Sequence, residues 1–155
     1  MFNAVLAAPF GRLGLRADAA VLHEIVFLPD SVALQAPDTA VAALAAAQLQ
    51  RYFDQADMHF DLPLADTGTP HRRRVWQAIA AIPRGQTRTY GALARELGSA
   101  PRAVGQACGA NPFPLVVPCH RVVAASGLGG FSNQAAEGLH RSIKRWLLRR
   151  EGVLQ

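Results

Sequence analysis

The sequence predicts an α+β protein, with a small antiparallel sheet and one helix in its first part and mostly helices in its second part. Residues 2–34 alternate short apolar runs with Gly, Pro and Asp, which is typical of short antiparallel strands. Much of the remaining chain carries apolar residues at helical spacing. With 155 residues, half of them hydrophobic, the chain is long enough to bury the core of one moderate domain or two small ones.

The first part is predicted as a sheet followed by a helix. Its strands would be the four apolar runs FNAVLAAP, FGRLGLRAD, AVLHEIVFLPD and VALQ. The helix would begin after Asp38, a residue type that caps helix N-termini, and continue through an Ala-, Leu- and Gln-rich segment. Residues 57–72 then lose this periodicity and gather Pro, Gly and Asp, as linkers do. The sequence therefore predicts two domains, 1–66 and 67–155.

Four helices are predicted in the second part. The first begins at Pro70, and the second covers TYGALARELG and ends on Gly98. The third is PRAVGQACGA, at residues 101–110. The last runs over 139–150 as an amphipathic helix, whose basic residues would lie opposite an apolar face formed by Leu139, Ile143, Trp146 and Leu147.

The second and third of these helices have the layout of a helix-turn-helix, a short helix, a glycine-containing turn and a second short helix. An ordinary helical hairpin would give the same pattern. The third helix offers base edges few hydrogen bonds, because apart from Arg102 its side chains are mostly small. If it binds DNA, this composition favours recognition of shape or of the minor groove.

Composition narrows the class of protein further. A formal net charge of +5 and an isoelectric point near 10.2 favour anionic partners, without separating nucleic acid from an anionic membrane. The only cysteines, Cys108 and Cys119, exclude a disulfide-rich scaffold and an all-cysteine zinc site. No apolar span reaches membrane length, and the N-terminus lacks the basic region of a signal peptide. A cytoplasmic protein without a membrane segment is expected.

Cys119 lies in the stretch NPFPLVVPCHRVV, at residues 111–123. Most buried cysteines are small inert hydrophobes, and that interpretation stays open here. Against it, Pro118 fixes the backbone before the thiol, His120 offers a proton acceptor, and Arg121 adds positive charge that favours a thiolate. Neighbouring side chains on a strand point to opposite faces, so a direct bond between Cys119 and His120 is left open.

These residues carry a resemblance to a known family. The chain resembles the O6-alkylguanine-DNA alkyltransferases, also called methylated-DNA–protein-cysteine methyltransferases. The most specific match is PCHRVV following NPFPLVVP. Further matches, in family order over most of the chain, are LPL (62–64), GTP (68–70), RVWQAI (74–79), TYGALA (89–94), RAVG (102–105) and WLLRREG (146–152).

The resemblance implies a ribonuclease-H-like N-terminal sheet with a helix, and a C-terminal domain with a winged-helix-like helix-turn-helix. It also implies direct-reversal DNA repair by a monomer without a cofactor. The partner would be double-stranded DNA carrying O6-alkylguanine, and also O4-alkylthymine. The damaged base would be flipped out, and Cys119 would take its alkyl group irreversibly, in a single turnover. Such a transfer needs a soft, strong nucleophile and no metal, which a thiolate supplies.

The resemblance also assigns site residues. Cys119 would be the acceptor, His120 would take its proton through a water, Glu151 would polarise His120, and Asn111 would order the turn and the thiol. Contacts with DNA would come from Tyr90, Arg102, Ala103, Gly105 and Gln106, with Tyr90 acting on the target nucleotide and Arg102 replacing the flipped base. The alkylguanine pocket would be lined by Tyr90, Cys108, Pro114, Val122 and Ser132. For Cys108, simple packing of a small residue is the favoured alternative.

Three features depart from the family pattern. The turn SAP before Arg102 is about two residues shorter than usual, and the segment before the last helix is several residues longer. His71 replaces an aromatic residue, either as a further basic contact or as part of a solvated face. Four of the five histidines, His23, His59, His71 and His140, are scattered along the chain, so no metal site is expected.

Three rival functions remain at this point. A DNA-damage sensor of the alkyltransferase-like class would lack the acceptor cysteine and commonly have tryptophan there, so Cys119 argues against it. A cysteine hydrolase would need a histidine distant in sequence and an oxyanion hole. A transcription regulator would use the helix-turn-helix with Cys119 as a packing residue.

Overall fold

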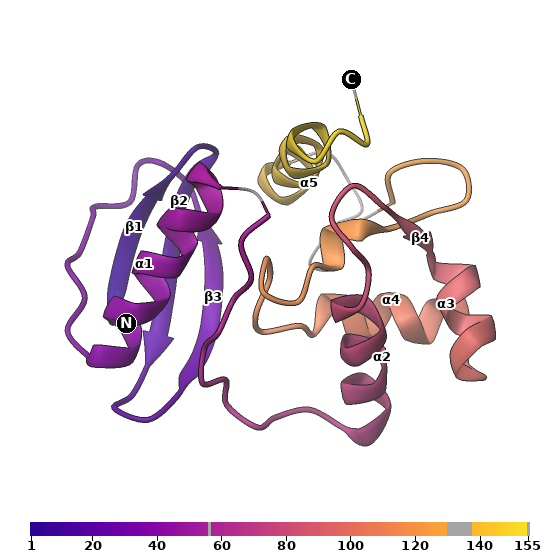
Figure 1. Ribbon diagram of the computed structural model, residues 1–155, viewed down its shortest axis with the longest axis horizontal. Helices are drawn as coiled ribbons and strands as arrows, with labels where there is room; N and C mark the ends of the chain where they lie inside the picture. Colours follow the sequence, from indigo (N-terminus) through magenta and orange to yellow (C-terminus); the bar gives the residue numbers. More distant parts are fainter. Residues whose placement is uncertain (56, 130–137, 155) are drawn as a thin grey trace. The chain divides into compact units, whose positions relative to one another are not determined.

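The computed structural model describes residues 1–55, 57–129 and 138–154. The chain divides into two compact units, Met1–Asp66 and Thr67–Gln155, each with its own elements (Figure 1). The predicted α+β class, with an N-terminal antiparallel sheet, is confirmed. Among the described residues, none of the helices has the length and apolarity needed to cross a membrane.

The first unit is a three-stranded antiparallel sheet with one helix packed on it. Its strands β1 (Ala4–Ala8), β2 (Gly11–Ala17) and β3 (Leu22–Leu28) are paired in chain order, and α1 (Ala40–Asp54) lies against them (Figure 1). Gly11 follows the two-residue turn between β1 and β2 with φ +143°, and a Cβ there would lie 2.7 Å from the Leu28 carbonyl oxygen. That position therefore requires glycine.

Two predictions for this unit are wrong. The run at 32–35 forms no fourth strand and makes only an isolated bridge between Gln35 and Val5. Helix α1 is capped by Thr39, whose hydroxyl accepts a hydrogen bond from the Ala42 N–H at 3.0 Å. Asp38 is not the cap, because its carboxylate accepts a hydrogen bond from the Asn3 amide, also at 3.0 Å.

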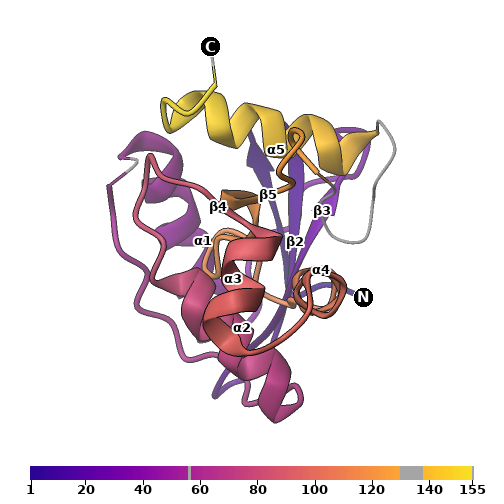
Figure 2. The same cartoon turned by 90° about the vertical axis from the view of Figure 1, so that its right-hand side faces the viewer.

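The second unit is mostly helical and contains α2 (Pro70–Ala80), α3 (Tyr90–Leu97), α4 (Pro101–Gly109) and α5 (Leu139–Arg150). A single 3₁₀ turn, η1, covers Cys119–Arg121. Two short strands, β4 (Arg88–Thr89) and β5 (Val122–Val123), pair in parallel (Figure 2). This pairing, which the sequence did not predict, brings the start of α3 beside the residues that follow Cys119.

Local signals set the ends of these helices as predicted. Pro70 and Pro101 are the first residues of α2 and α4, and α3 ends at Gly98 in the left-handed conformation, φ 64°. The short turn after Gly98 is closed by a hydrogen bond from the Ser99 N–H to the Ala94 carbonyl, at 2.8 Å. His71 in α2 contacts the Ser99 hydroxyl at 2.9 Å and so ties this turn to α2.

Helix α5 follows its prediction in part. Of the predicted apolar face, Ile143 and Leu147 are buried, Leu139 and Trp146 are half-buried, and Leu148, not predicted there, is buried as well. Lys144, expected on the basic face, is 0 % exposed. It precedes Leu147 by three residues and Leu148 by four, so it lies on the same helix face as they do.

Candidate active site around Cys119

Asn111 holds the turn that presents Cys119. Its side-chain oxygen accepts from the Phe113 N–H at 2.9 Å, and its amide nitrogen donates to the Val117 carbonyl at 3.0 Å. The same amide nitrogen donates to Cys119 Sγ at 3.2 Å. The turn also holds Leu115 at φ 76°, a left-handed backbone conformation that is costly for residues other than glycine. Asn111 therefore orders both the backbone of the turn and the thiol.

His120 is buried against Glu151. His120 is 0 % exposed, and its Nε2 lies 2.9 Å from Glu151 Oε2. Burial lowers the pKa of His120, although the Glu151 carboxylate opposes this shift. His120 is therefore neutral near pH 7 and donates its Nε2–H to Glu151. The other ring nitrogen, Nδ1, is left as an acceptor, and it has no hydrogen-bond partner among the described residues.

Glu151 follows α5 directly and binds His120 and Arg121. Burial disfavours its charged form, but hydrogen bonds from His120 and Arg121 outweigh burial and lower the pKa of Glu151 to about 2. Arg121 donates to both carboxylate oxygens, at 3.0 and 2.8 Å, and to the Ile82 carbonyl at 2.8 Å. Arg121 was expected to support a thiolate, but its guanidinium binds Glu151 instead. The carboxylate therefore stays ionised beside His120.

Cys119 and His120 are consecutive residues of a 3₁₀ turn and do not lie on a strand. The residue Cys119 is 3 % exposed. A hydrogen bond with Cys108, together with burial, raises the pKa of Cys119 well above its usual value, although Asn111 and Lys144 act in the opposite direction. The resting thiol is therefore protonated at neutral pH. Its ionisation needs a proton acceptor nearby, and His120 is the adjacent residue able to act as one.

Two further groups lie beside the thiols. Lys144 Nζ donates to the Val122 carbonyl at 2.7 Å and lies 5.9 Å from the centre of the Tyr90 ring. Burial lowers the pKa of Lys144 to about 8, while the neighbouring thiols favour its charged form. Burial, and then proximity to Cys108 and Cys119, raise the pKa of Tyr90, so its hydroxyl keeps its proton.

Sequence reasoning missed Lys144. The signal that could have revealed it is its spacing from Leu147 and Leu148, which places a lysine on the apolar face of an amphipathic helix.

Four of the five residues predicted to line the pocket lie in the described part of the chain. Tyr90 and Cys108 lie near the Cys119 thiol, Val122 binds Lys144 through its carbonyl, and Pro114 is buried in the turn after Asn111. Ser132 lies outside the described residues. Gly129, not predicted, packs on Tyr90, because a Cβ there would lie 3.1 Å from the Tyr90 ring and φ is +75°.

Four of the five residues predicted to contact DNA lie on α4, and the fifth, Tyr90, is the first residue of α3. Arg102 and Gln106 are exposed, and Ala103 and Gly105 are partly exposed. A Cβ at Gly105 would meet no atom within 4 Å, so the backbone there faces open space. Val104, Ala107 and Cys108 form the buried face of the helix. Helix α4 thus presents a side made of one long cation, one glutamine and small residues.

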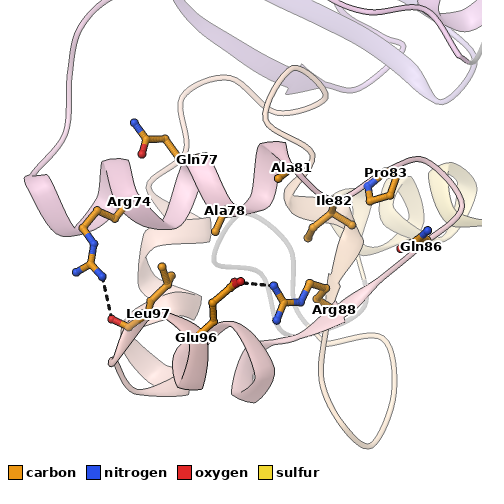
Figure 3. A pocket seen from close by; sticks show the side chains of 10 residues that line it. All are labelled: Arg74, Gln77, Ala78, Ala81, Ile82, Pro83, Gln86, Arg88, Glu96 and Leu97. Carbon is orange, nitrogen blue, oxygen red and sulfur yellow. Dashed lines mark hydrogen bonds and ion pairs between the residues drawn. The ribbon is translucent and has the colours of Figure 1, made fainter.

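A surface hollow of about 490 Å³ lies elsewhere in this unit (Figure 3). Its walls come from α2, from the end of α3 and from the segment 81–88 between them. Two contacts cross it: Arg74 donates to the Leu97 carbonyl at 3.0 Å, and Arg88 pairs with Glu96 at 2.6 Å. None of its ten lining residues is a predicted site residue. Across the described part of the chain, no group of three or more His, Cys, Asp or Glu residues is arranged to hold a metal ion.

Comparison with known proteins agrees with the geometry at Cys119. Residues 70–153 match the family model described as 6-O-methylguanine DNA methyltransferase, DNA binding domain. A methylated-DNA–protein-cysteine methyltransferase of Methanosarcina acetivorans is 39% identical, over 98% of this chain and 99% of that protein. A DNA base-flipping protein of Thermus thermophilus is 52% identical, over 68% of this chain and 70% of that protein.

A solved structure shows the same relationship at the level of the fold. The crystal structure of the Mycobacterium tuberculosis O6-methylguanine methyltransferase matches with a TM-score of 0.77 and 35% identity, over 97% of this chain and 93% of that one. A structure of the same protein in complex with DNA matches with a TM-score of 0.76 and 36% identity, over 95% and 90%. This chain belongs to the O6-methylguanine DNA methyltransferase family.

Proposed function

We propose that this protein repairs DNA by transferring the alkyl group of O6-alkylguanine, and also of O4-alkylthymine, to Cys119, once per molecule. The observation that carries this proposal is the arrangement on one turn of a thiol held by Asn111 and a neutral histidine held by Glu151. This arrangement supplies a nucleophile, a proton acceptor and a carboxylate that stabilises the protonated acceptor.

The proton moves first. His120 Nδ1 takes the Cys119 proton through a water, and the imidazolium that forms is stabilised by the ionised Glu151 2.9 Å from Nε2. Lys144, close to both thiols, favours the thiolate that is left. Asn111 keeps donating to Sγ and holds the sulfur in place.

Transfer of the alkyl group follows. The thiolate attacks the alkyl carbon, a C–S bond forms, and the bond from carbon to O6 breaks with its electron pair passing to the guanine. Tyr90, which keeps its proton because of burial, donates toward the base as that charge develops. The product is a thioether, which is too poor a leaving group to regenerate the thiol. The protein therefore acts once.

We further propose that unit 67–155 binds the duplex and carries the acceptor, while unit 1–66 is a ribonuclease-H-like domain. The exposed Arg102, the small residues of α4 and the net charge of +5 support binding in the minor groove with the damaged base flipped out. The protein would act as a monomer. The two free cysteines suit the reducing cytoplasm.

Intact-mass measurement tests the proposal. Incubation with duplex DNA containing O6-methylguanine should add about 14 Da per molecule, on the peptide with Cys119, and a thioether should prevent a second turnover. Cys119→Ser should bind the same DNA without any mass gain. Binding without mass gain by the unaltered protein would instead make it a base-flipping sensor, and repeated demethylation by substoichiometric protein would exclude irreversible transfer.

A further inference from the structure

The two cysteines of this chain lie together. Cys108 is in the last turn of α4 and Cys119 opens the 3₁₀ turn, yet both are buried and the Cys108 side chain is the neighbour that most strongly affects the Cys119 thiol. Asn111 connects them, because its backbone N–H donates to the Cys108 carbonyl at 3.2 Å and its side chain donates to Cys119 Sγ at 3.2 Å. The proposed acceptor thiol therefore has a second thiol as its immediate neighbour.

The groups around this pair favour one thiolate. From α5, Lys144 faces both sulfurs, with Arg141 near Lys144. From α3, Tyr90 faces both sulfurs and keeps its proton. His120 is the next residue on the turn. Cys108 and burial raise the pKa of Cys119, whereas Lys144 and Asn111 lower it. Once the Cys119 proton has moved to an acceptor, the Lys144 ammonium stabilises the anion, and a thiolate beside a thiol is the reactive state of a redox dithiol.

We propose that Cys108 and Cys119 form a reversible disulfide when hydrogen peroxide reaches the site. The Cys119 thiolate attacks one peroxide oxygen, an S–O bond forms, the O–O bond breaks, and hydroxide leaves and is protonated to water. The Cys108 sulfur then attacks the Cys119 sulfenic acid, an S–S bond forms, and a second water leaves. The two thiols lose two electrons and two protons, and one peroxide becomes two waters.

The disulfide has two consequences, of which the first rests on the proposed function. While its sulfur is bonded to Cys108, Cys119 cannot accept an alkyl group, and reduction by a dithiol restores it. The second is protection, because a sulfenic acid captured as a disulfide does not proceed to the irreversible sulfinic acid. Cys108 thus acts as a resolving cysteine for Cys119.

Peroxide treatment without DNA tests the disulfide directly. The full chain should lose about 2 Da, should lose both iodoacetamide-reactive thiols, and should yield a peptide that links Cys108 to Cys119. Dithiothreitol should reverse all three changes. Cys108→Ala and Cys108→Ser should instead gain about 32 Da on Cys119, as sulfinic acid, and dithiothreitol should not reverse that gain.

Methyl acceptance is measured on the same samples, each variant being compared with its own reduced state. The oxidised protein should accept at least about tenfold less methyl than the reduced protein and recover after dithiothreitol, while the oxidised Cys108 variants should not recover. Absence of the 2 Da loss, or an equal peroxide response of the unaltered protein and both variants, would overturn the dithiol. If peroxide forms the disulfide but the reduced protein accepts no methyl group, the proposed function alone would be overturned.

Discussion

Replacing Glu151 by Gln separates the proposed proton relay from the rest of the site. Gln has the shape of Glu but no charge, so it cannot stabilise an imidazolium at His120 as the carboxylate does at 2.9 Å. Its amide group can also donate to Nε2, which would move the ring proton to Nδ1 and remove the acceptor that the Cys119 proton needs. Glu151→Gln should therefore slow methyl transfer by about 100- to 10,000-fold, the range for loss of a positioned acid–base group.

The same substitution has a cost in stability. Folding lowers the pKa of Glu151 from 4.5 to about 2, and at 1.36 kcal/mol for each pKa unit this is worth about 3 kcal/mol. Because the folded pKa is the lower one, this stability is fully present above pH 4.5 and is lost as pH falls toward 2. The gap in unfolding free energy between the unaltered protein and Glu151→Gln should thus stay constant from pH 7 to 5 and narrow below 4.5.

The rate of methyl transfer is measured in a single turnover with the protein in excess. The unfolding free energy is measured by urea unfolding between pH 3 and 7. Glu96→Gln is the matched control, because Glu96 pairs with Arg88 at the surface with its side chain 53 % exposed. Such a pair contributes less than about 1 kcal/mol and lies outside the site. Transfer by Glu151→Gln within about threefold of the unaltered rate, or a stability cost no larger than that of Glu96→Gln, would refute the relay.

Three other substitutions test separate parts of the site. Asn111→Ala removes three hydrogen bonds, so it should lower the unfolding free energy in urea by about 2 kcal/mol and slow transfer at least tenfold; unchanged transfer would exclude its role at the thiol. Lys144→Met keeps the side-chain stem but removes the cation, so it should raise the pKa of Cys119 further and slow iodoacetamide alkylation at pH 8 by about tenfold. An unchanged alkylation rate would show that this charge does not act on the thiol. Arg102→Ala should slow repair of methylated duplex at least about tenfold but leave reaction with the free O6-alkylguanine base unchanged, because only the duplex requires base flipping. Equal slowing on both substrates would assign Arg102 to the fold or the pocket.

Features specified by neighbouring residues could be predicted from the sequence. Pro70, Gly98 and Pro101 mark helix ends through their own backbone preferences, and the structure has those ends as predicted. Asp38 and Thr39 are both good capping residues, so local preference could not choose between them. The choice depends on Asn3, 35 residues away, which binds the Asp38 carboxylate.

At the candidate site, long-range contacts account for what was missed. Arg121 was expected beside the thiol, but its partner Glu151 lies 30 residues away. The pairing of β4 with β5 joins residues more than 30 positions apart through two residues on each strand, too few to give a strand pattern. The influence of Cys108 on the Cys119 thiol depends on how the intervening turn folds back on Asn111, and no periodicity in the sequence predicts such a turn.

One helix sets the position of three consecutive residues at the active turn. Lys144 binds the carbonyl of Val122, and Glu151 binds the side chains of His120 and Arg121. Lys144 and Glu151 are seven residues apart, so about two helical turns and 10 Å of rise separate the two attachment points. One residue added between them would rotate Glu151 by about 100° relative to Lys144, and the two attachments could no longer form together. The length of this part of α5 is therefore fixed by the spacing of the groups that it holds, independently of how well the helix packs.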